Sequence, residues 1–208
     1  ARPPYNIDHE DSLIKSFKQN ALQFVEIRPT SEWEWMFLMR HHQVPTRLLD
    51  WTENPLVALY FATEKQQEDT EPVADGALWV LYPTLLNQAA GIRMPFPGDL
   101  PIFEDKDPVL GKYTPSGLKQ GDPQEPVAGI AARQSRRMIV QHSVFTVTHR
   151  DPKSLHLVPP GDQLGRFIVQ SSSKTTLRRQ LQTVLIDQER LFPDMDSVAR
   201  LARRRFDD

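Results

Sequence analysis

Six residues whose side chains could bind or polarise a small molecule lie within one short stretch of the sequence, HHQVPTRLLDWT, at residues 41–52. Arginine can hold an anion through its forked N–H groups, while hydroxyl and aromatic side chains can line a sugar or a base. An apolar segment follows directly, so the stretch precedes a helix N-terminus, where free backbone N–H groups bind anions such as a diphosphate. We therefore predict a functional polar site formed by His41, Thr46, Arg47, Asp50, Trp51 and Thr52, beside a helix N-terminus that can hold an anion.

The same residues also have a structural interpretation. Asp50 has apolar neighbours on both sides, so we expect its carboxylate to be half-buried and to need a partner. Arg47 is the nearest candidate cation, and we expect the two side chains to be in contact. Trp51 is expected to pack against the helix that follows. An ion pair would explain Arg47 and Asp50 but not the other polar residues, so both interpretations stay open.

Two helices are predicted before the polar stretch. Residues 8–26 repeat apolar residues at helical spacings, with Asp8 near the start, which indicates an amphipathic helix. Residues 31–42 start with a capping box and are too apolar for an exposed helix, so we predict a buried helix that Pro45 ends. The apolar face expected for the first helix is Leu13, Phe17, Ala21 and Phe24.

A strand and a third helix follow. Residues 46–52 are predicted to be extended, and Asn54 with Pro55 marks a helix start. Apolar residues surround almost the whole of this helix, which predicts that it lies in the core.

The second half of the chain is predicted to supply most of a sheet. We therefore expect one α+β domain over residues 1–208, with N-terminal helices packed on a mixed, mostly antiparallel sheet. The expected elements are a central strand at 76–82, one long strand or hairpin arm at 136–149, short strands at 154–160 and 166–170, and helices at 174–185 and 191–206.

Residues 83–126 are rich in proline and glycine, and their large side chains are scattered. Long loops without regular structure usually carry function or move. We expect this segment to be a mobile cover beside the site and not part of the core.

Composition excludes several classes of protein. The 208 residues carry 25 Lys and Arg against 27 Asp and Glu, so no strong net charge directs the chain to nucleic acid. Cysteine is absent, which excludes disulfides, thiolate zinc sites and cysteine nucleophiles, and suits the cytoplasm. We expect no membrane association, because no long apolar run is present.

Common catalytic motifs are also absent. The sequence has no P-loop, dinucleotide-binding glycine motif, nucleophile elbow or HExxH helix. No metal site is expected, since the neighbouring His41 and His42 diverge on a helix. The arginine clusters at 133–137 and 203–205 fit solvated faces as well as phosphate contacts.

Three segments together resemble the FRG domain family. HHQVPTRLLDWTENPLVALYFA is similar to its central signature, in which a His precedes Pro-Thr-Arg-Leu-Leu-Asp-Trp-Thr and an apolar helix. RMIVQHSVF resembles its Arg-x3-Gln-x3-Phe strand, and LFPDMDSVA resembles its Leu-Phe-Pro-Asp tail. The early Phe-Arg-Gly of the family is not among these residues, so either the sequence begins after it or this member departs from the family there. Arg40 stands where Gln is usual, and Gln43 and Ser143 stand where glycines are usual.

The family in turn resembles the ADP-ribosyltransferases, which implies an ADP-ribosyltransferase-like fold and NAD as a consumed substrate. On that template, DWT and its helix resemble the second motif and Gln141 the third, while the missing Arg would be the first. Breaking the ribose–nicotinamide bond passes through an oxocarbenium-like state that needs positioned polar groups. The resemblance implies catalytic roles for Gln141, Arg47 and Thr52, and NAD contacts for His41, Thr46, Asp50, Trp51 and Arg137.

Each role has a structural alternative. Arg47 could clamp the diphosphate or pair with Asp50, and Trp51 could line the ribose or fill the core. Gln141 could contact the ribose hydroxyls or be an inward residue of a strand, where alternation places it on the face of Ile139, Ser143 and Phe145.

Three functional classes remain. The first is an NAD-dependent ADP-ribosyltransferase or glycohydrolase, which the resemblance favours, as the toxic part of a bacterial phage-defence or toxin–antitoxin system. It implies a protein or nucleic-acid acceptor and an antitoxin or defence partner. The second is a non-catalytic module that binds a nucleotide or nucleic acid, favoured by the absent Phe-Arg-Gly and by Gln in place of Glu. The third is an interaction scaffold in which the proline-rich middle docks a partner.

Overall fold

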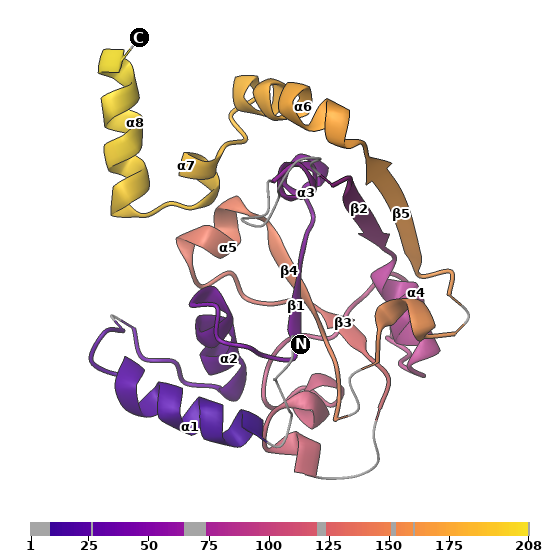
Figure 1. Cartoon of the computed structure of the whole chain (residues 1–208). Coiled ribbons are helices and arrows are strands. Elements are labelled where there is room, and N and C mark those ends of the chain that lie inside the picture. Colours follow the sequence, from indigo (N-terminus) through magenta and orange to yellow (C-terminus); the bar gives the residue numbers. More distant parts are fainter. Residues whose placement is uncertain are drawn as a thin grey trace. The chain divides into compact units, whose positions relative to one another are not determined.

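The computed structural model describes residues 9–25, 27–64, 74–119, 124–150, 153–159 and 161–207 (Figure 1). Helices and small antiparallel sheets give an α+β fold, as predicted. The Cα positions group into two compact units, each assembled from three separate stretches of chain. Unit 1 comprises Ala1–Asp50, Leu81–Ala132 and Phe145–Leu164, and unit 2 comprises Trp51–Val80, Arg133–Val144 and Gly165–Asp208.

The first two helices of unit 1 are α1 (Glu10–Ala21) and α2 (Glu32–His41). The predicted capping box is confirmed, because the Ser31 hydroxyl accepts from the Glu34 N–H and the Glu34 carboxylate accepts from the Ser31 N–H. Three α2 side chains are fully buried: Trp33, Met36 and Met39. The buried helix was therefore predicted correctly.

The prediction for the first helix holds in part. Phe24 lies beyond the last residue of α1 and is 80% exposed, whereas Ile14, not part of the expected face, is buried. The expected cap Asp8 lies outside the described residues.

Helix α2 ends at His41, four positions before the proline that was expected to end it, and the left-handed residue Gln43 turns the chain away. Gln43 has a φ of 62°, and its N–H donates to the Arg40 carbonyl while the Val44 N–H donates to the Met39 carbonyl. A residue other than glycine pays a steric cost in this conformation. Gln43 stands where the FRG domain family, which this sequence resembles, usually has glycine. The backbone therefore adopts the left-handed turn that glycine favours, although the residue is glutamine.

The proline- and glycine-rich segment was expected to be a cover outside the core. Instead, it supplies much of the core of unit 1. Proline starts helix α4 (Pro83–Ala89) in the position where it is favoured. The Asp107 carboxylate accepts from the N–H groups of Val109 and Leu110 and so stabilises a 3-10 helix at Leu110–Tyr113. These local bonds replace strand pairing and bury scattered side chains, namely Leu86, Phe103, Leu110, Tyr113 and Leu118.

Two small sheets are present in the described residues. Strands β1 (Leu48–Thr52), β4 (Ser143–Val147) and β3 (Val127–Gly129) form a sheet in the order β1-β4-β3, with β3 and β4 antiparallel. Strands β2 (Gly76–Leu81) and β5 (Leu164–Val169) pair with each other alone. The prediction of β2 as a central strand was therefore wrong.

Two other predicted strands are helical at least in part. The expected strand at 136–149 begins as helix α5 (Arg136–Val140), because the Ser135 hydroxyl caps it by accepting from the Met138 N–H. The expected strand at 154–160 contains a 3-10 helix at Leu155–Leu157. Short apolar runs do not distinguish a strand from a helix, which explains both errors.

Unit 2 is built around helix α3 (Pro55–Ala62), whose start is capped by the Asn54 side chain, as predicted. The prediction that α3 lies in the core holds only in part, since Leu56 and Phe61 are 41% and 38% exposed. Besides α5, the unit contains the helices α6 (Ser171–Thr183), α7 (Gln188–Leu191) and α8 (Met195–Asp207). The buried cluster consists of Val57, Tyr60, Leu181 and Leu191, with Leu59, Ile186 and Phe192 packed against it.

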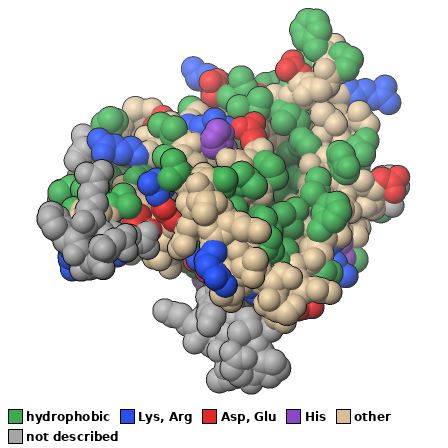
Figure 2. All heavy atoms as spheres, turned by 90° about the horizontal axis from the view of Figure 1, so that it is seen from above, with side chains coloured by type: hydrophobic (Ala, Val, Ile, Leu, Met, Phe, Trp, Pro, Cys, Tyr) green, Lys and Arg blue, Asp and Glu red, His purple; other side chains and the backbone are tan. Residues whose placement is uncertain are grey.

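Hydrophobic side chains also reach the surface, as Figure 2 shows for one face of the molecule. Within the described part of the chain, no helix is both long enough and apolar enough to cross a membrane.

Candidate functional site

The eight residues predicted to form one site divide equally between the two units. His41, Thr46, Arg47 and Asp50 belong to unit 1, and Trp51, Thr52, Arg137 and Gln141 belong to unit 2. Each group is described within its own unit.

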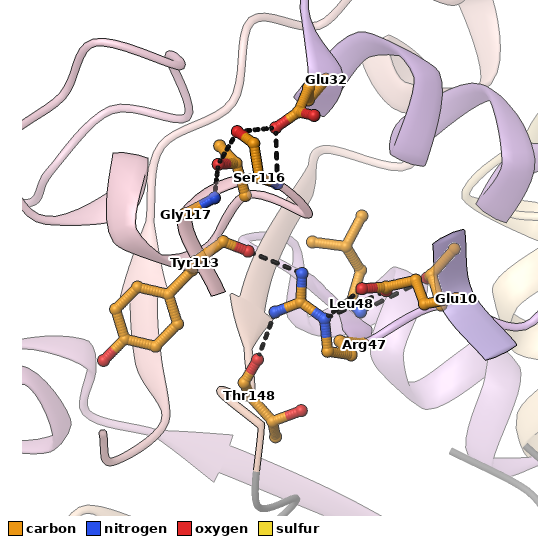
Figure 3. Close-up of polar contacts among 10 residues, drawn as sticks. Glu10, Glu32, Arg47, Leu48, Tyr113, Ser116, Gly117 and Thr148 are labelled. Carbon is orange, nitrogen blue, oxygen red and sulfur yellow. Dashed lines mark hydrogen bonds and ion pairs between the residues drawn. The ribbon is translucent and has the colours of Figure 1, made fainter. Parts of the chain in front are cut away.

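Arg47 is the centre of a buried hydrogen-bond network in unit 1 (Figure 3). Its Nε donates to both carboxylate oxygens of Glu10, at 3.0 and 2.9 Å. Its Nη1 donates to the Thr148 carbonyl at 2.7 Å, and its Nη2 donates to the Tyr113 carbonyl at 2.6 Å. The guanidinium thereby links α1, the 3-10 helix before Thr114 and the end of β4.

This geometry corrects the expected pairing of Arg47 with Asp50. Asp50 instead accepts from the Nε of Arg40 at 2.6 Å, and its side chain is 48% exposed. Arg47 pairs with Glu10, 37 positions earlier in the chain. With all three nitrogens bonded and a side chain only 2% exposed, Arg47 has a structural role and offers no accessible anion clamp.

His41 and Thr46 differ in their exposure to solvent. His41 is exposed at the end of α2, where its ring makes an edge contact with the ring of His42 at 4.9 Å. Thr46 is buried, and its hydroxyl accepts from the Leu48 N–H at 3.3 Å. Among the described residues, no group of three or more His, Asp or Glu side chains could hold a metal ion.

In unit 2, the structure brings Thr52 and Gln141 together although 89 positions separate them. The Thr52 hydroxyl donates to the Gln141 carbonyl at 2.6 Å and accepts from the Asn54 N–H at 3.0 Å. The next backbone carbonyl, that of His142, accepts from the Glu53 N–H at 3.1 Å. Two consecutive carbonyls therefore hold the turn that leads from β1 into α3.

Gln141 is the C-cap of α5 and not a residue within a strand, so the alternation argument for it was wrong. Its side chain is nevertheless buried, with 8% exposed. The amide Nε2 donates to the Leu191 carbonyl at the end of α7, at 2.9 Å. The side chain thus joins α5 to α7, and the contact shown is structural.

The remaining two predicted residues differ in their surroundings. Trp51 is half-buried, and its expected packing against α3 stays a prediction. The guanidinium of Arg137 lies over the Phe192 ring at 4.6 Å, and that ring makes an edge contact with Phe61 at 6.1 Å. An arginine stacked on an aromatic ring is desolvated on one face and can still direct N–H groups outward.

Sequence analysis did not identify Glu53 or His142, which lie around the Thr52–Gln141 contact, and it named Arg133 only within an arginine cluster. Glu53 is exposed and forms an ion pair with Arg133, while the exposed His142 has a left-handed φ of 48°. A positive φ outside glycine is uncommon and often marks functional sites. Only the position of Glu53 directly after DWT could have suggested its importance.

The hydroxyl of Tyr60 is buried in the core of unit 2, and the structure shows no hydrogen-bond partner for it among the described residues. Burial raises the pKa of Tyr60 above its ordinary value of 10.0, while the nearby charge of Arg178, 4.4 Å over the ring, opposes that shift. Tyr113 in unit 1 also has a raised pKa, through burial and the charge of Glu125. Its hydroxyl donates to the Glu125 carbonyl at 2.6 Å.

The strand–turn–helix arrangement from Leu48 to Ala62 is the one that the FRG resemblance implies. The family model for the FRG domain matches residues 2–71, so this part of the chain is similar to the FRG domain family. The match includes the six polar residues at 41–52 and does not reach Arg137 or Gln141. No curated protein and no solved structure matches the chain, so the ADP-ribosyltransferase resemblance of the fold stays a prediction.

Proposed function

We propose that this protein is an NAD-dependent ADP-ribosyltransferase or NAD glycohydrolase whose reacting groups lie in unit 2. The observation that supports the proposal is the 2.6 Å hydrogen bond from Thr52 to Gln141. These residues were chosen from two separate motifs because both resemble NAD-binding motifs. Their contact within one compact unit is what a shared site requires.

The proposal gives the residues different roles from those expected. Arg47 is excluded as the diphosphate clamp because its guanidinium is buried and bonded to Glu10. Arg137, half-buried on Phe192, is the cation proposed for the diphosphate. Trp51 and Thr52 are proposed to line the nicotinamide ribose. Gln141 is proposed to hold Thr52 in position.

A non-catalytic nucleotide-binding module is the second candidate. It is favoured by the Gln141 side chain, whose amide is engaged with Leu191 and which lacks the charge that stabilises an oxocarbenium ion. The scaffold hypothesis stays a third alternative, although its proposed docking segment supplies the core residues Leu86, Phe103 and Leu110. Within the first candidate, a role in phage defence or as a toxin remains part of the proposal.

Incubation of the purified chain with NAD, with and without cell extract, tests the proposal. We expect release of free nicotinamide, and label from adenine-labelled NAD on an acceptor if transfer occurs. Arg137→Gln is expected to raise KM for NAD about 10-fold or more, because one charge-assisted contact to the diphosphate is lost. Arg179→Gln, an exposed arginine on α6, is the matched control and should leave KM unchanged. NAD binding without nicotinamide release would favour the second candidate.

A further inference from the structure

The turn between β1 and α3 presents a carboxylate that neither the motifs nor the proposed function uses. Glu53 directly follows Thr52, and its side chain is 58% exposed. Its backbone N–H donates to the His142 carbonyl at 3.1 Å, so the backbone of this residue is fixed although its carboxylate is open to solvent. A charged group on a fixed turn can act on a ligand without first being ordered.

The surroundings of Glu53 also orient its carboxylate. Arg133, 33% exposed, forms an ion pair with it from the segment that precedes α5. An exposed pair of this kind contributes little to stability, so stability alone does not explain why it is formed. The pair brings a cation and a carboxylate to the edge of the Thr52–Gln141 contact.

The backbone that holds Glu53 is strained. His142 has a φ of 48°, and this conformation follows directly after Gln141, whose own carbonyl accepts from the Thr52 hydroxyl. The left-handed residue thus lies where two successive carbonyls are both bonded to the β1–α3 turn. Strain of this type persists where the surrounding structure requires it, which is common at sites of chemistry.

We infer that Glu53, oriented by Arg133 and the His142 backbone, is the catalytic carboxylate of this site. The inference rests on the proposed function, and it supplies the negative charge that Gln141 lacks. Gln141 is then a positioning residue, since it acts through its carbonyl on Thr52 and through its amide on α7.

The corresponding reaction is hydrolysis of NAD at the nicotinamide ribose. The bond from C1′ to the nicotinamide nitrogen breaks, both electrons leave with nicotinamide, and positive charge develops on the ribose. A water oxygen forms the new bond to C1′, and the Glu53 carboxylate accepts the proton that the water loses. The products are ADP-ribose, nicotinamide and one proton, which Glu53 later releases to solvent. In transfer, an acceptor group replaces the water.

Steady-state nicotinamide release by the full chain tests this assignment. Glu53→Gln is expected to lower kcat about 100-fold or more with little change in KM, as loss of a general base does. Glu53→Asp should retain part of the activity, because it keeps a carboxylate on a shorter side chain. Glu64→Gln, an exposed glutamate just beyond α3, is the matched control and should behave like wild type.

The outcomes separate the two proposals. Nicotinamide release by wild type with an equally active Glu53→Gln would overturn the role of Glu53 and leave the proposed function standing. No release by wild type, with or without extract, would overturn both. Thermal unfolding of Glu53→Gln should match wild type, because the side chain is exposed. A lost rate that comes with a lost fold in Glu53→Gln would count against the assignment.

Discussion

Glu10 and Arg47 form a buried ion pair in which both carboxylate oxygens accept from one guanidinium nitrogen, although the residues are 37 positions apart. Their side chains are only 4% and 2% exposed. The remaining guanidinium nitrogens donate to backbone carbonyls of Tyr113 and Thr148, so the charge is paired and hydrogen-bonded on every side (Figure 3). The signature arginine of the PTRLLDWT segment is therefore tied to residues from three distant parts of unit 1.

Removing one member of this pair should destabilise the protein strongly. Glu10→Gln leaves the Arg47 charge buried without its counter-ion, and we expect a loss of about 3 to 5 kcal/mol in the free energy of unfolding. Urea unfolding followed by circular dichroism measures it. Asp50→Asn removes the carboxylate of the exposed pair with Arg40 and is the matched control, with an expected change of about 1 kcal/mol or less. Equal effects of the two substitutions would contradict the central role of Arg47.

The buried tyrosines predict a stability change at alkaline pH. The pKa of Tyr60 is raised in the folded state, so the folded protein retains this proton more tightly than the unfolded chain. The resulting stability is complete below a pH of about 10, the pKa in the unfolded chain, and declines as pH rises above it. Tyr60→Phe should reduce this alkaline loss when the free energy of unfolding is measured between pH 8 and 11.

The two tyrosines should differ at pH 7. Tyr60→Phe removes a hydroxyl that has no hydrogen bond among the described residues, so we expect little loss or a small gain in stability. Tyr113→Phe leaves the Glu125 carbonyl without its donor and should cost about 1 to 3 kcal/mol. A larger loss for Tyr60→Phe than for Tyr113→Phe would show that the Tyr60 hydroxyl has a partner in solution.

Replacing Gln43 by glycine should stabilise the end of α2. Gln43 has a φ of 62°, which costs an L-residue about 1 to 2 kcal/mol, and glycine recovers part of this while losing more entropy on folding. We expect Gln43→Gly to raise the free energy of unfolding by about 0.5 to 1 kcal/mol. Gln43→Ala keeps the steric cost and is the control. No difference between the two variants in chemical denaturation would contradict the left-handed turn.

Local signals predicted local structure well. The Ser31–Glu34 box and the Asn54 cap are hydrogen bonds between residues a few positions apart, so both could be predicted from spacing alone. The partner of Arg47 could not, because nothing in the sequence ranks Glu10 above the nearer Asp50. Electrostatic attraction identifies a kind of partner, while the fold decides which candidate is within reach.

Errors were concentrated where one pattern fits two structures. The apolar run before Gln141 fits a strand, yet the Ser135 hydroxyl caps it as a helix. Likewise, the prolines before Leu110 predict a mobile loop, whereas the Asp107 carboxylate orders that turn. In both cases a single side-chain acceptor determined the local structure. The structure brings Gln141 and Thr52 together, but their contact runs through a backbone carbonyl.

The last prediction concerns Gln141, whose direct and positioning roles give different results. Its amide donates to the Leu191 carbonyl, so Gln141→Ala should leave that carbonyl unpaired and cost about 1 to 3 kcal/mol in the free energy of unfolding. Nicotinamide release should fall with it, because the backbone carbonyl that accepts from the Thr52 hydroxyl is less firmly held once the side chain no longer bonds to Leu191. A direct contact with the ribose would instead lower turnover by about two orders of magnitude or more, with the melting temperature nearly unchanged.

Gln141→Glu separates these roles further. A carboxylate cannot donate to the Leu191 carbonyl, so as a positioning residue the variant should be about as unstable as Gln141→Ala and no more active. If Gln141 instead occupies the place of a catalytic glutamate, the added charge should increase nicotinamide release while the melting temperature stays close to that of wild type. A more active and equally stable Gln141→Glu would return the catalytic role from Glu53 to Gln141.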